Sequence, residues 1–236
     1  MVDKSNQRSK EYPRYSQRVI DSSMRTGGPR VVGTLDSAYD LDPDFAELYV
    51  EYVRGEMYSR TVLDRVTREL CACAALTALD KQMQLEGHMQ NALWAGATRA
   101  QVLEAIVQMV VYAGFPAVLT ALKTFRKVCP PDPADRNRAP KTSWFDGDRE
   151  SGYYQPAIEA GTRLYGEEYA RSIIDRANKW DKDFGWAFQR FVYGGMYNRA
   201  VVDVKTRQLL AVAGCVVTNA LPQLDVMFVA RFESSS

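Results

Sequence analysis

The sequence repeats itself at a spacing of 139 residues. The stretch DPDFAELYVEYVRGEMYSRTVLDRVTREL, which begins at Asp42, aligns with DKDFGWAFQRFVYGGMYNRAVVDVKTRQL, which begins at Asp181. The alignment extends without a gap to residues 15–84 over residues 154–223. Self-similarity at a fixed spacing indicates a duplicated structural unit, so we expect two copies of one fold in this chain.

The two copies differ at titratable positions. Glu56 of the first copy aligns with Gly195, and His88, the only histidine in the chain, aligns with Met227. Positions that both copies share are explained by a common fold, whereas a polar group found in one copy only is a candidate for chemistry. Glu56 and His88 are therefore a candidate acid/base pair in the first copy, and the alternatives are a satisfied core histidine and a solvated glutamate between helices.

The spacing of apolar residues predicts helices. Asp42 followed by Pro43 is typical of a helix start, and we expect that helix to end at Gly55. No stretch of useful length alternates apolar and polar residues, so the sequence predicts an all-α fold. Two further helix faces are marked by apolar residues three and four apart, at Leu63, Val66, Leu70, Cys73, Ala74 and Ala78, and at Leu85, His88, Met89, Ala92 and Leu93.

Local signals predict the helix ends that follow. Gly96 is placed to cap the helix that carries His88. Thr98 with Gln101 three residues later is a capping-box pattern for the next helix, and we expect Gly114 to end that helix.

Composition divides the chain into three parts. The first domain, residues 1–130, would start with a polar arm over residues 1–40, because Gly and Pro at residues 27–29 break any early helix. Residues 131–152, rich in Pro, Asp and Arg, are predicted to be a linker. Residues 153–236 would be a degenerate, truncated second repeat that lacks counterparts of two helices.

The second repeat would expose apolar side chains if it stood alone. It should therefore pack on the first repeat or on another subunit, and we expect a homo-oligomer. The side chains concerned are Leu210, Val217, Leu224 and Phe228.

Charge and hydropathy limit the partners. The 30 Lys and Arg residues against 29 Asp and Glu residues give a net charge of +1, which supplies no basic surface for nucleic acid. The N-terminus has no apolar segment typical of a secretory signal. The most apolar window, residues 102–122, contains Gly114 and Pro116 and predicts two packed helices rather than a membrane span. We expect a cytoplasmic protein with no membrane or nucleic-acid partner.

Four cysteines and one histidine offer little for a metal site. Cys71 and Cys73 would lie about 200° apart around a helix, so they cannot easily form a disulfide with each other. We predict that these two cysteines are small buried hydrophobic residues and that the protein holds no metal.

The stretch RGEMYSRTVLDRVTRELCACAALTALDKQMQLEGHMQNALWAGATRAQVLEAIVQMVVYAGFPAVLTAL resembles the carboxymuconolactone decarboxylase family, part of the superfamily that includes the alkylhydroperoxidase D proteins. Its most specific parts are GE, VTREL, QLEGHMQNAL and VYAGFPA. The resemblance implies an alkylhydroperoxidase D-like helical bundle that assembles as trimers or hexamers with active sites near subunit contacts. In the hydroperoxidase branch a CxxC precedes the histidine, but the matching residues here are Lys81 and Gln84, so thiol redox chemistry is not expected.

The decarboxylase branch acts on a lactone that bears a carboxylate and uses no metal or organic cofactor. Loss of CO₂ leaves an enolate, which must be stabilised and protonated in a pocket that excludes water. The resemblance implies that His88 carries the proton, because a histidine side chain titrates near neutral pH. Glu56 would then fix the histidine tautomer or serve as a second acid/base.

Other residues of this stretch are candidate substrate contacts. Arg60 and Arg68 would form forked contacts with a carboxylate, which lysine does not match. Their counterparts Arg199 and Arg207 lie in the copy without histidine, which favours a structural role such as pairing with Asp64 or its copy. Three aromatic residues would wall the pocket: Tyr58, Trp94 and Tyr112.

We therefore predict a cofactor-independent lyase that acts on a carboxylated lactone or a related enolisable small molecule. Two alternatives stay open. An isomerase, cyclase or retro-aldol enzyme for a larger biosynthetic metabolite needs the same enolate chemistry. A non-catalytic assembly or binding protein would keep the fold and leave the pocket unused.

Overall fold

The computed structural model of the protein describes residues 15–131 and 147–233, and every regular element in these residues is a helix. The all-α prediction is therefore confirmed. Most of the predicted linker, residues 132–146, lies outside the described residues, and the domain boundaries stay a prediction.

Two series of helices follow one another along the chain. The first consists of α2 (Gln17–Gly27), α3 (Pro29–Leu41), α4 (Pro43–Val50), the π-helix η1 (Glu51–Met57), α5 (Arg65–Ala78), α6 (Gln82–Ala95), α7 (Arg99–Val107) and α8 (Val110–Val128). The second consists of α9 (Gln155–Tyr165), α10 (Glu167–Trp180), α11 (Lys182–Phe188), the π-helix η3 (Gln189–Met196), α12 (Val204–Val217) and α13 (Leu221–Glu233).

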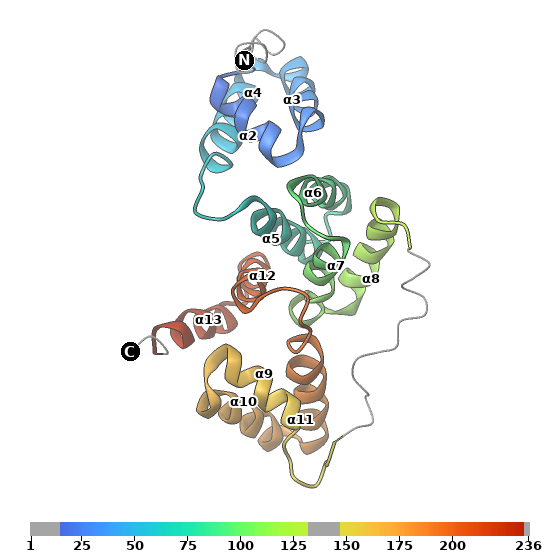
Figure 1. The fold of residues 1–236 in the computed structure, drawn as a ribbon, viewed down its shortest axis with the longest axis vertical. Coiled ribbons are helices and arrows are strands. Elements are labelled where there is room, and N and C mark those ends of the chain that lie inside the picture. The colour runs from blue at the N-terminus through green and yellow to red at the C-terminus, as the bar shows by residue number, and fades with distance from the viewer. Residues whose placement is uncertain (1–14, 132–146, 234–236) are drawn as a thin grey trace.

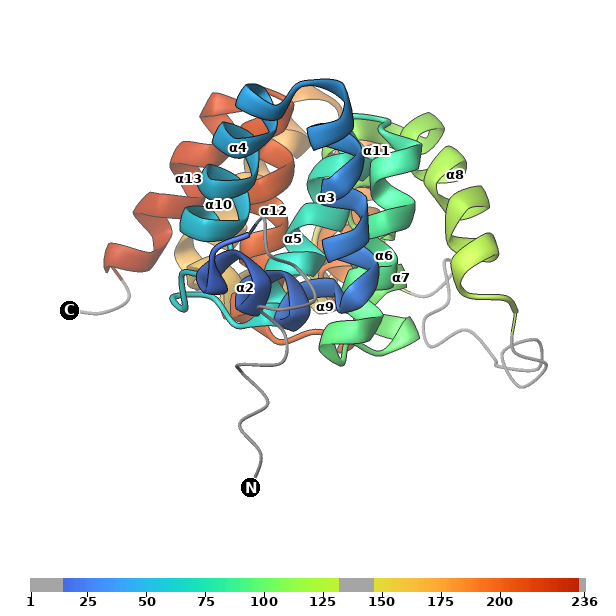
Figure 2. The same ribbon diagram turned by 90° about the horizontal axis from the view of Figure 1, so that it is seen from above.

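The second series follows the first from α2 to α6. Each helix from α9 to α13 begins and ends within one residue of the place that a 139-residue shift gives for its counterpart. A duplication would produce this correspondence, and the duplication itself stays an inference from the sequence. Figure 1 shows α2 to α4 at one end of the molecule, α5 to α8 in the middle and α9 to α11 at the other end. α12 returns from that end and packs along α5, and α2 packs over α5 and α6 (Figure 2).

Several helix ends follow the local signals in the sequence. Asp42 caps α4 with Pro43 in its first turn, and Thr98 and Gln101 form the predicted capping box of α7. Gly96 ends α6 with a φ of 105°, a left-handed conformation that glycine adopts without strain.

The prediction that Gly55 ends a helix is wrong. α4 passes directly into η1, which runs through Gly55 to Met57. Gly55 is buried where η1 packs on α2, and a Cβ at this position would lie 2.8 Å from a side-chain oxygen of Glu51. The glycine therefore permits close packing and does not stop the helix.

The prediction of a polar arm over residues 1–40 is also wrong for the part that the structure describes. The chain breaks at Gly28, where φ is 67°, but α2 and α3 form on either side of it. The Ser16 side chain caps α2, and Val19 and Ile20 are fully buried. Because so few apolar residues anchor this helix, composition gave little indication of it.

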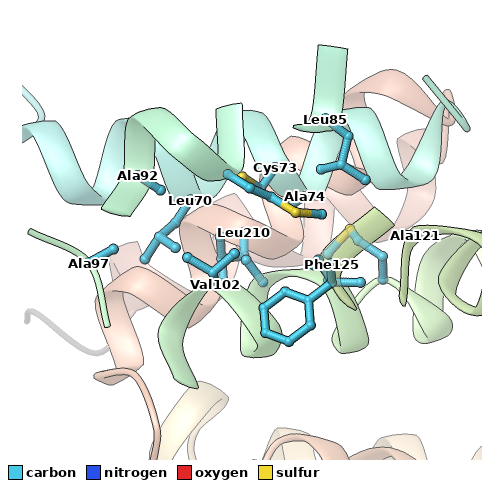
Figure 3. Close-up of a cluster of buried hydrophobic side chains, with 14 of the residues drawn as sticks. Leu70, Cys73, Ala74, Leu85, Ala92, Ala97, Val102, Ala121, Phe125 and Leu210 are labelled. Carbon is cyan, nitrogen blue, oxygen red and sulfur yellow. The ribbon is translucent and has the colours of Figure 1, made fainter. Parts of the chain in front are cut away.

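A shared apolar core joins the two series. Leu70, Cys73 and Ala74 of α5 are buried, and Leu210 of α12 lies in the same cluster (Figure 3). Burying one leucine side chain contributes about 2 kcal/mol. The burial of Leu210 confirms that the second series packs on the first.

Buried charges connect α12 to α7. Glu104 of α7 is fully buried, and its two carboxylate oxygens accept from Arg207 Nη2 and Arg199 Nε, each at 2.7 Å. Gln108 accepts from Arg207 Nη1 at 3.0 Å and donates to the Arg207 carbonyl at 2.9 Å. Arg207 thus has the structural role that was predicted, but its carboxylate partner is Glu104 rather than the predicted Asp203.

The apolar stretch of α7 and α8 changes direction at two places, after Val107 and at Gly114. α7 ends at Val107, earlier than predicted, and Gly114 interrupts α8 with a φ of 77°. Among the described residues, no single helix is long and apolar enough to cross a membrane, and α7 and α8 pass that test only as a pair bent by 116°. The predicted break at Gly114 is confirmed.

We expect Arg207→Ala to lower the free energy of unfolding by about 3–5 kcal/mol, because it leaves the buried Glu104 charge with only one cationic partner. Urea denaturation at pH 7 measures the loss. Arg18→Ala is the control, since Arg18 pairs with the half-exposed Glu56, and an exposed pair contributes about 0–1 kcal/mol. Equal losses in the two variants would contradict the importance assigned to the buried charges.

Candidate active site

The only histidine of the chain lies against a buried carboxylate. His88 Nδ1 on α6 is 2.7 Å from Glu69 Oε2 on α5. The Glu69 side chain is fully buried, and the His88 side chain is 23% exposed. Because an ionised carboxylate can only accept, the shared proton belongs to Nδ1. Within the described part of the chain Nε2 has no hydrogen-bonding partner, so it is available to a ligand.

Helix packing sets the geometry of this pair. α5 begins at Asp64, whose carboxylate accepts from the backbone N–H of Thr67 at 2.9 Å and from its hydroxyl at 2.6 Å. A turn at Asp80, where φ is 55°, then leads into α6, which packs along α5. The pair is therefore carried by two helices and not by a loop.

Tyr58 at the end of η1 lies close to Glu69. Burial, followed by the charge of Glu69, raises the pKa of Tyr58 to about 12, although Arg54 and Arg68 act in the opposite direction. The guanidinium carbons of Arg54 and Arg68 are 4.6 and 5.5 Å from the centre of the Tyr58 ring. Tyr58 therefore stays a neutral hydroxyl near neutral pH.

Arg54 is a buried cation with an unused donor. Its residue is 8% exposed, and Nη1 donates to the Thr26 hydroxyl at 3.2 Å. Arg54 Nε and Glu69 Oε1 are both buried and have no hydrogen-bonding partner in the structure. Buried polar groups are rarely left unpaired, so water or a ligand would be expected to complete each of these two atoms.

The sequence analysis missed Glu69 and Arg54, although the internal repeat carries a signal for both. Glu69 aligns with Gln208, and Arg54 aligns with Tyr193. Each charge is therefore present in the first copy only, as the imidazole of His88 is. The change from Glu to Gln is small, and only the structure shows that it removes the partner of the histidine.

The structure does not bring Glu56 to His88. Glu56 forms a forked ion pair with Arg18, at 2.6 and 3.1 Å, and both side chains are about half exposed. The predicted Glu56 and His88 pair is thus corrected to Glu69 and His88. The π-helix directs Glu56 towards α2, and the contacts of its side chain with described residues, which are to Arg18, do not support a catalytic role.

Three of the predicted substrate contacts do lie together. Tyr58, Arg60 and Arg68 line one cavity of about 220 Å³. Arg68 donates to the carbonyls of Met57 and Arg60 at 2.6 and 2.7 Å. This cavity adjoins Glu69 through Tyr58.

Trp94 and Tyr112 make other contacts. Trp94 is mostly exposed, and its Nε1 donates to the Met24 carbonyl of α2 at 3.2 Å, so it braces α6 against α2. The Tyr112 hydroxyl forms a hydrogen bond with that of Tyr197 in the second series. The structure therefore does not place either residue in a pocket wall beside His88.

A larger cavity of about 370 Å³ lies in the second series. Its described lining is aromatic and aliphatic for the most part, includes Tyr112 of α8, and contains Met227, the counterpart of His88, but no histidine, aspartate or glutamate. Size alone would favour this cavity as a binding site. The proposed acid/base chemistry, however, needs a histidine with a carboxylate beside it, and these are Glu69 and His88 of the first series.

The cysteines are not placed for redox chemistry. Burial raises the pKa of Cys71 to about 11 and that of Cys73 well above its usual range, and thiolate is the reactive form. Lys81 and Gln84, where a CxxC would stand, are exposed. In residues 15–131 and 147–233, no group of three or more His, Cys, Asp or Glu side chains is arranged to hold a metal ion.

The segment that carries Glu69 and His88 is similar to known proteins. Residues 43–127 match the model of the carboxymuconolactone decarboxylase family. The chain is 30% identical to the 4-carboxymuconolactone decarboxylase of Acinetobacter baylyi over 115 residues, which are 49% of this chain and 86% of that protein.

Two further relatives match the chain. It is 27% identical to the nitrosuccinic acid decarboxylase npaB of Metarhizium robertsii over 116 residues, 47% of this chain and 81% of that protein. It is also 36% identical to an uncharacterised 15.0 kDa protein of Paracoccus denitrificans. That match covers 76 residues, which are 31% of this chain and 57% of that protein.

The raised pKa of Tyr58 predicts a loss of stability in alkali. Below pH 10 the tyrosine is protonated in both the folded and the unfolded state, so its contribution is fully present. Between pH 10 and about 12 the unfolded state releases this proton first, so the folded state is progressively disfavoured. We expect the free energy of unfolding, measured by urea denaturation, to fall across this window by on the order of 2 kcal/mol less in Tyr58→Phe than in wild type. Tyr52→Phe, at an exposed position, should behave as wild type. Identical losses for wild type and Tyr58→Phe would contradict the prediction.

Proposed function

Because the chain belongs to the carboxymuconolactone decarboxylase family, we propose that it is a lyase that removes CO₂ from a carboxylated lactone or a related enolisable acid. The observation that carries the proposal is the 2.7 Å contact between His88 Nδ1 and the buried Glu69. Both residues lie in the segment that matches the family.

The proposed reaction exchanges CO₂ for a proton. The bond between the carboxylate carbon and the adjacent carbon breaks, CO₂ leaves, and the electron pair moves into the conjugated carbonyl to give an enolate. Protonation of carbon by His88 Nε2–H then gives the product. Since one CO₂ leaves and one proton enters, the substrate is neither oxidised nor reduced by another molecule.

Glu69 is proposed as the positioning residue of His88. It accepts from Nδ1–H, which holds the ring in one orientation and leaves Nε2 towards the ligand. A carboxylate in this position also stabilises the imidazolium form that donates the proton. His88 is the catalytic residue, and Glu69 acts through it.

Tyr58 is proposed to stabilise the enolate. Its high pKa keeps the hydroxyl protonated, and a neutral donor can hydrogen-bond to a developing oxyanion. Arg54 stacks on the same ring and is buried, so its positive charge would act in surroundings that screen it weakly.

We also propose that the protein assembles into a homo-oligomer. α4 and η1 carry a group of large apolar side chains that are exposed in the single chain: Phe45, Leu48, Tyr49 and Tyr52. Such exposed patches are typical of interaction sites. A monomer in light scattering would contradict this part of the proposal. The cytoplasmic location stays a prediction.

Proton NMR in D₂O with γ-carboxymuconolactone tests the reaction. Wild-type protein should remove the carboxylate and place deuterium in the product. His88→Ala should lower the rate by about 10²–10⁴-fold, because it removes the proton donor. Glu69→Gln should lower the rate less, since the imidazole remains but loses its carboxylate partner.

Glu56→Gln is the matched control for Glu69→Gln. Because Glu56 contacts Arg18 and not His88, we expect its rate to match that of wild type. Equal rates for wild type and His88→Ala would contradict the proposed donor. If deuterium exchanges into the substrate without loss of CO₂, the acid/base pair serves an isomerase or cyclase instead. If wild-type protein shows neither deuterium exchange nor loss of CO₂, γ-carboxymuconolactone is excluded as the substrate.

A further inference from the structure

The second helix series shows how the fold binds a carboxylate. The Glu104 carboxylate accepts from Arg199 Nε and from Arg207 Nη2, each at 2.7 Å. Gln108 and Tyr112 follow at four-residue intervals, and they contact Arg207 and Tyr197. The two arginines thus donate to a carboxylate and an amide oxygen, and the tyrosine hydroxyl forms a hydrogen bond with another hydroxyl.

The first series has the same receiving residues. Arg60, Arg68 and Tyr58 stand where the 139-residue shift places Arg199, Arg207 and Tyr197. The contacts among the two arginines and the tyrosine are also the same in both series. Arg68 Nη2 donates to the Arg60 carbonyl at 2.7 Å, and Arg207 Nη2 donates to the Arg199 carbonyl at 2.5 Å. The Arg68 guanidinium is 5.5 Å from the Tyr58 ring centre, against 5.9 Å for Arg207 and Tyr197.

In the first series the carboxylate is missing from this arrangement. Among the described residues, the Arg60 side chain has no hydrogen-bond or ion-pair partner, and Arg68 donates only to backbone carbonyls. The two arginines face a cavity of about 220 Å³, where two further arginines lie. The one acidic residue in its lining, Asp64, is already bonded to the N–H and hydroxyl of Thr67. The cavity is therefore cationic, and among the described residues its arginine side chains have donors that no carboxylate accepts from.

We propose that Arg60 and Arg68 bind a carboxylate of a small molecule in the way that Arg199 and Arg207 bind Glu104. One oxygen of the ligand accepts from Arg60 Nε and the other from Arg68 Nη2. An arginine fork suits this planar group, and a charge-assisted bond of this kind is stronger than a neutral one.

The location gives the bound carboxylate a role in the reaction. Tyr58 lines the cavity and lies close enough to Glu69 for its pKa to respond to that charge. A ligand held by Arg60 and Arg68 would therefore extend past Tyr58 towards Glu69 and His88. The substrate then has two carboxylates, one that is retained at the arginines and one that leaves as CO₂. This assignment of the ligand as substrate rests on the proposed function, whereas binding of the carboxylate does not.

A second copy of this chain does not fit as the occupant. Glu104 is the residue with which the fold fills the equivalent arginine pair, and it is fully buried between Arg199 and Arg207. Another copy would have to break its own buried ion pair to present it. A small free carboxylate has no such cost, and about 220 Å³ is enough space for a short dicarboxylate.

Isothermal titration calorimetry of the full chain with succinate tests the site, with acetate and inorganic phosphate as comparison ligands. We expect succinate to bind and Arg60→Gln to weaken it at least tenfold. The Arg60 side chain is exposed and has no hydrogen-bond or ion-pair partner in residues 15–131 and 147–233, so this variant should fold as wild type does. Arg126→Gln is the control, because Arg126 is an exposed arginine on α8 that does not line the cavity, and this variant should leave succinate binding unchanged.

Three results would overturn the proposal. They are no binding of succinate by wild type, tighter binding of phosphate than of succinate, and equal weakening in Arg60→Gln and Arg126→Gln. Because the assay needs no turnover, it separates the two proposals. Succinate binding without decarboxylation would leave the site standing and remove the proposed reaction. Decarboxylation that Arg60→Gln does not affect would leave the reaction standing and overturn the assignment of the site to the substrate.

Discussion

The arrangement of this protein depends on one buried negative charge. Glu104 carries it into the interior on α7, and Arg199 and Arg207 of the second series neutralise it. Removing such charges from water costs several kcal/mol, so the carboxylate is tolerated only where both arginines reach it. This requirement keeps Arg207 of α12 against Glu104 of α7 and so restricts where α12 can lie. With α12 fixed there, Leu210 enters the core beside α5, and the two helix series form one packed unit.

The two series share one arrangement of helices but carry different side chains at equivalent positions. In the first, Glu69, His88 and Arg54 gather charge around Tyr58. In the second, Gln208, Met227 and Tyr193 stand at the equivalent positions, and the described lining of the neighbouring cavity contains no histidine, aspartate or glutamate. The helix ends and the aspartate caps agree closely between the series, so the difference lies in side chains and not in backbone. The proposed chemistry thus belongs to the first series, and the second series contributes to packing.

The sequence predicted the parts of the fold that local chemistry determines. Asp42 with Pro43, Gly96 and the pair Thr98 and Gln101 gave helix boundaries that the structure confirms, because caps act through neighbouring backbone groups. The candidate site was only half predicted. Glu56 and Glu69 both differ between the copies, and no local pattern shows which one meets the histidine. That choice depends on a π-helix and on the packing of α5 against α6, and neither has a signal in apolar spacing.

α5 is held on two faces at once. One face presents Glu69 to α6, and the other meets α12 in the shared core. A helix clamped in this way has little freedom to slide or rotate, so the carboxylate beneath the imidazole is kept in register by side chains that never approach a substrate. The second series, which lacks a histidine in its sequence, thereby sets the mechanical stiffness of the site in the first.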